Sequence, residues 1–170
     1  GCDYGFRSFT IANGAVFRSC TFIWCNVAVA CNLNTDGADR GIYFNNCYFE
    51  QNKTAIKPYI GKLLHINQCY FEANTEYIID IFSDHPNTIT NPIVVLENSL
   101  IDLYPSDLTS NKAVIRQTLA SHDLTLTLVV KNNSIISHEV KPDYFAYVVV
   151  GNIAIQAENN IFDDPNNSFP

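Results

Sequence analysis

The 170-residue chain has no methionine, few charged residues and no apolar run close to the length of a membrane span. Because Met is missing, Gly1 is not a translation start, and we expect the chain to be a piece of a longer protein. A membrane-spanning helix needs about 20 consecutive apolar residues, so the sequence predicts no membrane span. The 10 Lys and Arg residues are scattered singly against 17 Asp and Glu residues. Without a basic stripe, we expect no nucleic-acid partner.

Metal and cofactor motifs are also missing. The cysteines form no CxxC pair, and no His lies near them at zinc-ligand spacing. The sequence contains no phosphate loop, dinucleotide fingerprint or Ser-His-Asp grouping. We therefore expect no metal site and no cofactor, and we interpret the thiols as reduced and mostly buried. The six cysteines are Cys2, Cys20, Cys25, Cys31, Cys47 and Cys69.

What the sequence does contain is an internal repeat, which reads apolar, any residue, Asn or a similar residue, a small residue, any residue, apolar. Six copies occupy 17–22, 44–49, 66–71, 96–101, 130–135 and 157–162. The small residues serve as anchors at 20, 47, 69, 99, 133 and 160, so successive anchors are 27, 22, 30, 34 and 27 residues apart. Such spacings are typical of solenoid coils joined by loops of unequal length.

The residue types inside each copy predict a strand, a sharp bend and a second strand. Apolar and polar residues alternate before the anchor, which indicates a strand with one buried face. Asn tolerates left-handed backbone angles, so it can turn the chain at the bend. Further apolar runs between the copies provide a third strand for each coil. We therefore expect Asn46, Asn98, Asn132 and Asn159 to adopt left-handed or bridging angles and to bond along a column.

Stacking of the coils also predicts the core. Strands about 4.8 Å apart place like residues over like residues. We expect Cys20, Cys47 and Cys69 to point inward, beside a parallel stack of Phe rings. The stacked rings are those of Phe22, Phe49 and Phe71. Parallel side chains have poor geometry for a disulfide, so we expect none among these three cysteines.

The segments 46–50 (Asn-Cys-Tyr-Phe-Glu) and 158–162 (Glu-Asn-Asn-Ile-Phe) resemble repeats of the right-handed parallel β-helix superfamily, which includes pectate lyases, polygalacturonases and phage tailspikes. The resemblance covers roughly residues 16–163. It predicts an all-β fold, a right-handed parallel β-helix of about six coils within residues 1–163, with 164–170 as a linker or tail. A β-sandwich and a left-handed β-helix are the alternatives, and the uneven spacing argues against the left-handed form.

Residues 34–39 (Asn-Thr-Asp-Gly-Ala-Asp) are similar to a polygalacturonase motif whose first Asp belongs to the catalytic carboxylates. Asp36 and Asp39 are therefore candidate catalytic residues. The acid pair that follows in that family is replaced here by Gln51 and Asn52, and an amide cannot serve as the acid or base of a hydrolase. We therefore favour a polar loop with a Gly turn at 34–39.

A second set of candidates comes from the repeat register. Three residues after successive anchors lie Glu50, Glu72 and Asp102, which would form an outward column of acids. Neighbouring acids would lie about 4.8 Å apart and the outer two nearly 10 Å apart, separations that bracket those of retaining and inverting glycosidases. A solvated acidic edge is the simpler interpretation. Candidate substrate-binding residues beside the acids are Tyr48, Tyr70 and His65.

A third group, Asp80, Asp84 and His85, opens a loop between coils, and we interpret it as a capped turn.

Function is predicted only through the resemblance. It implies a tailspike-type protein that recognises or depolymerises polysaccharide, as hydrolase or lyase, in a virion tail or outside the cell. Such proteins are commonly homotrimers. The alternatives are a non-catalytic β-helix that serves as an adhesin or stalk, and a fragment of a divergent pectinase.

Overall fold

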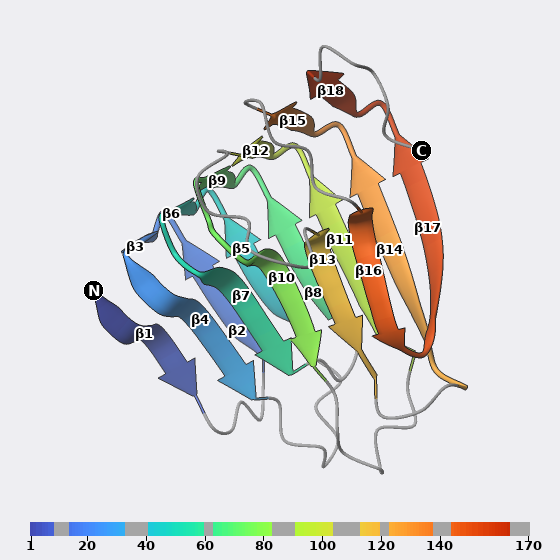
Figure 1. Ribbon diagram of the computed structural model, residues 1–170, viewed down its shortest axis with the longest axis horizontal. Coiled ribbons are helices and arrows are strands. Elements are labelled where there is room, and N and C mark those ends of the chain that lie inside the picture. Colours follow the sequence, from blue (N-terminus) through green and yellow to red (C-terminus); the bar gives the residue numbers. More distant parts are fainter. Residues whose placement is uncertain are drawn as a thin grey trace.

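The computed structural model describes residues 1–8, 14–32, 41–59, 63–82, 91–103, 113–119, 123–137 and 144–163. These residues form 18 strands in three six-stranded sheets, here named A, B and C, and the described residues include no helix (Figure 1). A helix able to cross a membrane is therefore not found in the described part of the chain.

In spatial order, sheet A contains β1 (Cys2–Ser8), β4 (Cys25–Asn32), β7 (Thr54–Tyr59), β10 (Tyr77–Phe82), β13 (Ala113–Thr118) and β16 (Tyr144–Val150). Sheet B contains β2 (Ala15–Arg18), β5 (Ile42–Asn45), β8 (Leu63–Asn67), β11 (Ile93–Glu97), β14 (Thr125–Lys131) and β17 (Asn152–Glu158). Sheet C contains β3 (Thr21–Ile23), β6 (Tyr48–Glu50), β9 (Tyr70–Glu72), β12 (Leu100–Leu103), β15 (Ser134–Ser137) and β18 (Ile161–Asp163).

From β1 to β15, each strand pairs in parallel with the strand three places later in the chain. One strand from each sheet therefore makes one coil, and the chain winds through six coils, as the repeat predicted. Figure 1 shows the coils side by side, with the first at the N-terminal end of the stack and the sixth at the other. The predicted parallel β-helix is confirmed, and each anchor lies at the corner between a strand of sheet B and one of sheet C.

The corner between sheets B and C turns on one residue with left-handed backbone. Asn46, Asn98, Asn132 and Asn159 have φ of 54°, 51°, 53° and 53°, which confirms the prediction for these four. The same position in the other two coils also has left-handed backbone, although it is not Asn: Ser19 has φ 51° and Gln68 has φ 53°.

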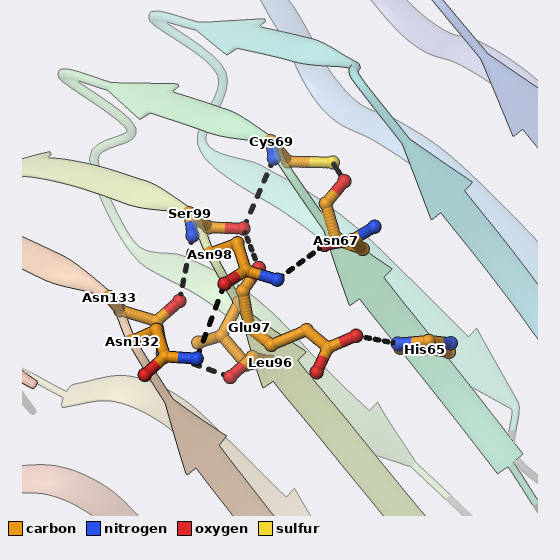
Figure 2. Close-up of polar contacts among 9 residues, drawn as sticks. All are labelled: His65, Asn67, Cys69, Leu96, Glu97, Asn98, Ser99, Asn132 and Asn133. Carbon is orange, nitrogen blue, oxygen red and sulfur yellow. Dashed lines mark hydrogen bonds and ion pairs between the residues drawn. The ribbon is translucent and has the colours of Figure 1, made fainter. Parts of the chain in front are cut away.

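The side chains of Asn46, Asn98 and Asn132 bond from coil to coil at this corner, as expected. Asn132 Nδ2 donates to Asn98 Oδ1 at 3.3 Å, and Asn46 Nδ2 donates to Ser19 Oγ at 3.3 Å. Asn98 Nδ2 donates at 2.9 Å to Asn67 Oδ1, one residue before the corresponding corner position (Figure 2). The polar column therefore shifts by one residue at the third coil, where Gln68 replaces Asn.

A second corner, between sheets C and A, also uses left-handed backbone, which the sequence did not indicate. Trp24, Gln51 and Ala73 have φ of 58°, 52° and 50° after β3, β6 and β9. The three residues share no side-chain chemistry, and non-Gly residues rarely adopt this conformation without support from surrounding structure.

The core is built from columns of like side chains. Phe22 and Phe49 stack with ring centroids 5.3 Å apart, and Phe49 and Phe71 with centroids 4.9 Å apart and planes at 6°. A second column places Phe17 on Phe44 at 4.7 Å. Phe44, Phe49 and Phe71 are fully buried, so the predicted Phe stack is confirmed. Aromatic pairs of this kind add about 0.5–1.5 kcal/mol beyond the area that they bury.

All six cysteines are free thiols in the structure. Cys47 and Cys69 are buried beside the Phe column, and Cys20 in the first coil is half-buried, so the three point inward as predicted. The hydrogen bond that Cys47 and Cys69 share lowers the pKa of Cys47 and raises that of Cys69. Burial alone raises the pKa of Cys31 to about 12.

Candidate functional site

Sheet C brings the three acids of the repeat into one register. β6, β9 and β12 pair Glu50 with Glu72, and Glu72 with Asp102. The expected column of acids on consecutive coils therefore exists, with neighbouring backbones about 4.8 Å apart. Its exposure is uneven, because Glu50 and Glu72 are half-buried while Asp102 is only 8 % exposed. Asp102 keeps the expected register with Glu72, but it is more shielded from solvent than the other two acids.

Two tyrosines on the same strands contact two of these acids. Tyr48 OH donates to Glu72 Oε2 at 2.5 Å, and Tyr70 OH lies 3.4 Å from Asp102 Oδ2. Each phenol thus reaches from its own coil to the acid of the next coil. The contact with Tyr70 covers the Asp102 carboxylate and contributes to its burial. We name these residues the acid–tyrosine ledge, and its members are Tyr48, Glu50, Tyr70, Glu72 and Asp102.

The neighbouring acids raise the pKa of both tyrosines. The hydrogen bond to Glu72 is the largest cause that raises the pKa of Tyr48 above its ordinary value. Burial, followed by the charges of Glu72 and Asp102, raises the pKa of Tyr70 to about 12. Both phenols therefore stay protonated near neutral pH and act as hydrogen-bond donors. Their ring centroids lie 5.1 Å apart and the planes are tilted by 33°, so the two rings pack against each other.

The third candidate binding residue, His65, lies on a different sheet. It belongs to β8 of sheet B, and its Nε2 is 2.7 Å from Glu97 Oε1 of β11 (Figure 2). The Tyr43 ring lies edge-on to the imidazole, with centroids 6.0 Å apart. The sequence did not predict the contact between His65 and Glu97. The residue paired with His65 is Val95, and Glu97 lies two residues further along β11. Alternation along both strands could have shown that the two side chains share one face.

Asp36 and Asp39 lie outside the described residues. The two amides Gln51 and Asn52 are described, and both have structural roles. Gln51 has left-handed backbone, and its Oε1 accepts a hydrogen bond from Trp24 Nε1. Asn52 is fully buried; its Oδ1 accepts from Cys25 N at 3.0 Å and its Nδ2 donates to Phe22 O at 3.0 Å. An ionised Asp at 52 could accept but not donate, which explains why an amide occupies this position.

Sheet A contains an ion cluster that the sequence did not reveal. Asp80 is 2 % exposed, and its carboxylate makes a bidentate pair with Arg116, at 2.8 Å to Nε and 2.7 Å to Nη2. Lys57 Nζ lies 3.5 Å from the same carboxylate. Arg116 also lies over the Tyr77 ring, with Cζ 4.3 Å from the centroid, and its hydrogen bond to Asp80 raises its pKa.

The interpretation of Asp80 as part of a capped turn is therefore wrong, because it lies inside β10 and links three neighbouring strands. Asp84 and His85 lie outside the described residues. Breaking a buried ion pair costs several kcal/mol, so this cluster is a cross-link of the coils.

The described residues contain no group of three or more His, Cys, Asp or Glu that could hold a metal ion. No known protein family, curated protein or solved structure matches the chain. The acid–tyrosine ledge is a candidate site on the evidence of its register and its hydrogen bonds.

Proposed function

We propose that this chain recognises polysaccharide through the acid–tyrosine ledge. The observation that carries the proposal is the hydrogen bond from Tyr48 OH to Glu72 Oε2 across two coils. It holds an aromatic ring and a carboxylate together on two half-buried residues of sheet C, and both groups suit sugars. Sugar C–H groups pack against an aromatic face, while a carboxylate accepts hydrogen bonds from sugar hydroxyls.

The repetition of the ledge suits a polymer better than a single sugar. Tyr48 and Tyr70 are paired in register, as are Glu50 and Glu72, so the second and third coils present the same pair of groups. A chain of sugars lying along the stack meets this arrangement more than once. Multiple weak contacts of one kind add up to useful affinity when they lie on one rigid surface.

Cleavage of the glycan is the stronger form of the proposal. Glu50 and Glu72 occupy neighbouring strands, a spacing close to the roughly 5–5.5 Å between the carboxyl groups of retaining glycosidases. In a retaining hydrolysis one carboxylic acid protonates the glycosidic oxygen as its bond to the anomeric carbon breaks, and the second carboxylate bonds to that carbon. Water then displaces the second carboxylate, with its hydroxyl going to the anomeric carbon and its proton to the first carboxylate. Glu72 is central in the column and is the acid that we expect to matter most.

The resemblance to β-helix depolymerases extends this proposal to a tailspike-type protein that forms a homotrimer in a virion tail or outside the cell. One observation favours a second candidate, a non-catalytic stalk. The phenols of Tyr48 and Tyr70 bond to acids of the next coil, so the ledge also cross-links coils mechanically. A stalk needs such links and no ligand.

The test is binding to a panel of capsular, O-antigen and pectic polysaccharides, measured by calorimetry, together with assays for new reducing ends and unsaturated products. Tyr70→Leu removes one ring of the ledge and should weaken binding at least tenfold, since stacking on an aromatic ring contributes roughly 0.5–1.5 kcal/mol for each contact and the lost phenol adds to it. Tyr43→Leu removes a ring from sheet B and should leave binding unchanged. Equal binding by folded Tyr70→Leu and wild type would reject the ledge. Absence of binding to every polysaccharide would favour the stalk.

A further inference from the structure

The ion cluster of sheet A lies in the middle of the stack. Lys57, Asp80 and Arg116 come from β7, β10 and β13, three neighbouring strands that are each paired on both edges (Figure 1). Lys57 Nζ and Arg116 Nη2 lie 3.5 Å and 2.7 Å from the same oxygen, Asp80 Oδ2. Two cations therefore converge on one carboxylate, which leaves the cluster with a surplus of positive charge.

Hydrogen-bond donors also outnumber acceptors in this cluster. A guanidinium has five N–H groups and accepts no hydrogen bond. Arg116 donates from Nε and Nη2 to Asp80, and from Nη1 to the Tyr77 hydroxyl at 3.3 Å. Within the described part of the chain, one N–H on each terminal nitrogen of Arg116 is left without an acceptor.

The Tyr77 hydroxyl adds a further donor. It accepts the hydrogen bond from Arg116, but among the described residues its own proton meets no acceptor. Tyr77 is only 8 % exposed, so solvent has little access to this side chain. A buried donor without an acceptor is costly, and native structures rarely keep one. The cluster therefore needs an acceptor with a negative charge.

We propose that Lys57, Tyr77 and Arg116 bind an oxyanion at the outer face of sheet A: a carboxylate, phosphate or sulfate group. Such a group supplies several acceptor oxygens and balances the surplus positive charge. Charge-assisted hydrogen bonds from a guanidinium to a carboxylate or phosphate are among the strongest that proteins make. The side chains of Lys57 and Arg116 are 43 % and 32 % exposed, so a ligand can reach both from solvent.

The donors are held in place before a ligand arrives. Asp80 is 2 % exposed and fixes Arg116 by a bidentate pair, while the Tyr77 ring lies 4.3 Å from Arg116 Cζ. Donors that are already ordered lose little conformational freedom on binding. Lys57 is less constrained, because 3.5 Å is long for a hydrogen bond between charged groups. Its ammonium can therefore turn from Asp80 toward an incoming anion.

The charges around the cluster favour an anion on sheet A over sheet C. The residues that flank the cluster in its column are Ala30 and Tyr147, and neither is acidic. The strands of sheet C contain no Lys or Arg, and their acids are Glu50, Glu72, Asp102 and Asp163. An anion is therefore repelled by the acid–tyrosine ledge. Acids elsewhere on the chain are largely screened beyond about 8 Å at physiological ionic strength.

The test is a titration of the ¹⁵N-labelled 170-residue chain with sodium phosphate at constant ionic strength, followed by the NMR signal of Arg116 Nε–H. This signal should shift and saturate, whereas that of Arg18 Nε–H on sheet B should not. Dextran sulfate and neutral dextran form the second arm. Binding of dextran sulfate at least tenfold tighter than phosphate identifies a polymeric anion as the ligand, because many sulfates compete for one site. Equal affinity for each anion identifies a free ion.

Two variants test the residues of the site. Lys57→Gln removes one cation and leaves the pair of Asp80 and Arg116, so the chain should fold and bind phosphate roughly three- to tenfold more weakly. Tyr77→Phe keeps the ring beside Arg116 and removes the hydroxyl, and it should also weaken binding. The matched control is Lys53→Gln, which changes the net charge equally at an exposed residue outside the cluster. It should bind as the wild type does.

An Arg116 signal that neither phosphate nor dextran sulfate shifts overturns the oxyanion site. An equal shift with neutral dextran also overturns it, as does a loss of binding in Lys53→Gln as large as in Lys57→Gln. Circular dichroism checks that each variant is folded. The result is independent of the proposed glycan site, because Lys57→Gln leaves every residue of the acid–tyrosine ledge in place.

Discussion

The corner between sheets C and A in the early coils and the corner between sheets B and C in the late coils use one hydrogen-bonding device. In the early coils the backbone N–H of Asn52 donates to Asn74 Oδ1 at 3.2 Å, and Asn74 Nδ2 donates to Phe49 O at 2.9 Å. In the late coils the N–H of Ser99 donates to Asn133 Oδ1 at 2.9 Å, and Asn133 Nδ2 donates to Leu96 O at 2.9 Å (Figure 2).

In both corners a buried Asn side chain accepts a hydrogen bond from a backbone N–H of the preceding coil. The same side chain donates to the backbone carbonyl three residues before that N–H. The device therefore belongs to the corner and not to a particular sheet. It needs a side chain that donates and accepts at once, because a buried backbone group without a partner is costly. Where the B–C corner contains Cys47 and Cys69 instead, the side chain packs as a small apolar group.

The largest loss of stability is expected when the side-chain N–H donor of the buried Asn at these corners is removed. Asn52→Asp keeps the shape but leaves the Phe22 carbonyl without its donor and buries a charge, so we expect a loss on the order of 3 kcal/mol at neutral pH. Asn133→Asp should lose a similar amount, since its amide occupies the same geometry. Asn46→Asp at the exposed part of the corner should lose less than about 1 kcal/mol. Urea unfolding of the three variants measures the comparison.

The pH dependence of Asn52→Asp provides a check on the cause. Burial raises the pKa of the introduced carboxyl above its unfolded value of about 3.9. The protonated acid can donate, so the variant is most stable below the unfolded pKa, and this stability is lost as pH rises through the folded pKa. A loss of stability that is the same at acidic and neutral pH would show that the missing donor is not the cause.

The next prediction compares the stability lost at an exposed corner Asn with the stability lost at the buried ones. Asn98→Val places a β-branched residue at φ 51° and removes the bond to Asn67, so we expect a loss of about 1–3 kcal/mol. Asn98→Gly keeps the backbone conformation accessible and removes only the side-chain bonds. If Val and Gly lose the same amount, the polar column stabilises the corner more than the left-handed backbone does. An unchanged melting temperature in Asn98→Val would show that neither matters.

These corners also show what could be read from the sequence and what could not. The B–C corner was predicted because its strand, bend and anchor lie within six consecutive residues, so the pattern is local and repeats. The C–A corner was missed, because Trp24, Gln51 and Ala73 share a backbone conformation imposed by neighbouring coils and no residue type. Local sequence carries no signal for a conformation that tertiary packing imposes.

The same distinction holds for the candidate site. The acid column followed from the anchors, whereas the burial of Asp102 depends on the neighbouring coil and was not predicted. The ion cluster of Lys57, Asp80 and Arg116 takes one residue from each of three coils separated by loops of unequal length. Its members are close only once the register of sheet A is known, which is why single-sequence patterns did not find it.

A smaller effect comes from introducing the amide where the chain has a thiol. Cys69→Asn adds the amide to the column that contains Ser99, whose Oγ accepts from the backbone N of residue 69 at 3.1 Å. Asn is close to Cys in volume, so we expect a change of less than about 1.5 kcal/mol. Cys69→Leu overpacks the same site and should lose about 1–3 kcal/mol. A loss in Cys69→Asn as large as in Cys69→Leu would show that the two corners are not interchangeable.

The smallest effect on stability, and the largest on function, is expected at Glu72. Glu72→Gln keeps an oxygen to accept the bond from Tyr48 and removes only the charge, so unfolding free energy should change by less than about 1 kcal/mol.

Loss of a catalytic acid lowers turnover by orders of magnitude while binding survives, whereas a solvated Glu can be replaced with little effect on either. In a protein that contains this chain and cleaves a glycan, we therefore expect the Glu72→Gln variant to lose cleavage and to retain glycan binding. Glu97→Gln is the matched control on sheet B, where it removes the charge beside His65 and leaves the ledge intact. Wild-type turnover in Glu72→Gln, on a substrate that the parent cleaves, would make the ledge a binding or structural surface and assign the chemistry to other residues. Loss of turnover in Glu97→Gln alone would move the site to His65 and its sheet.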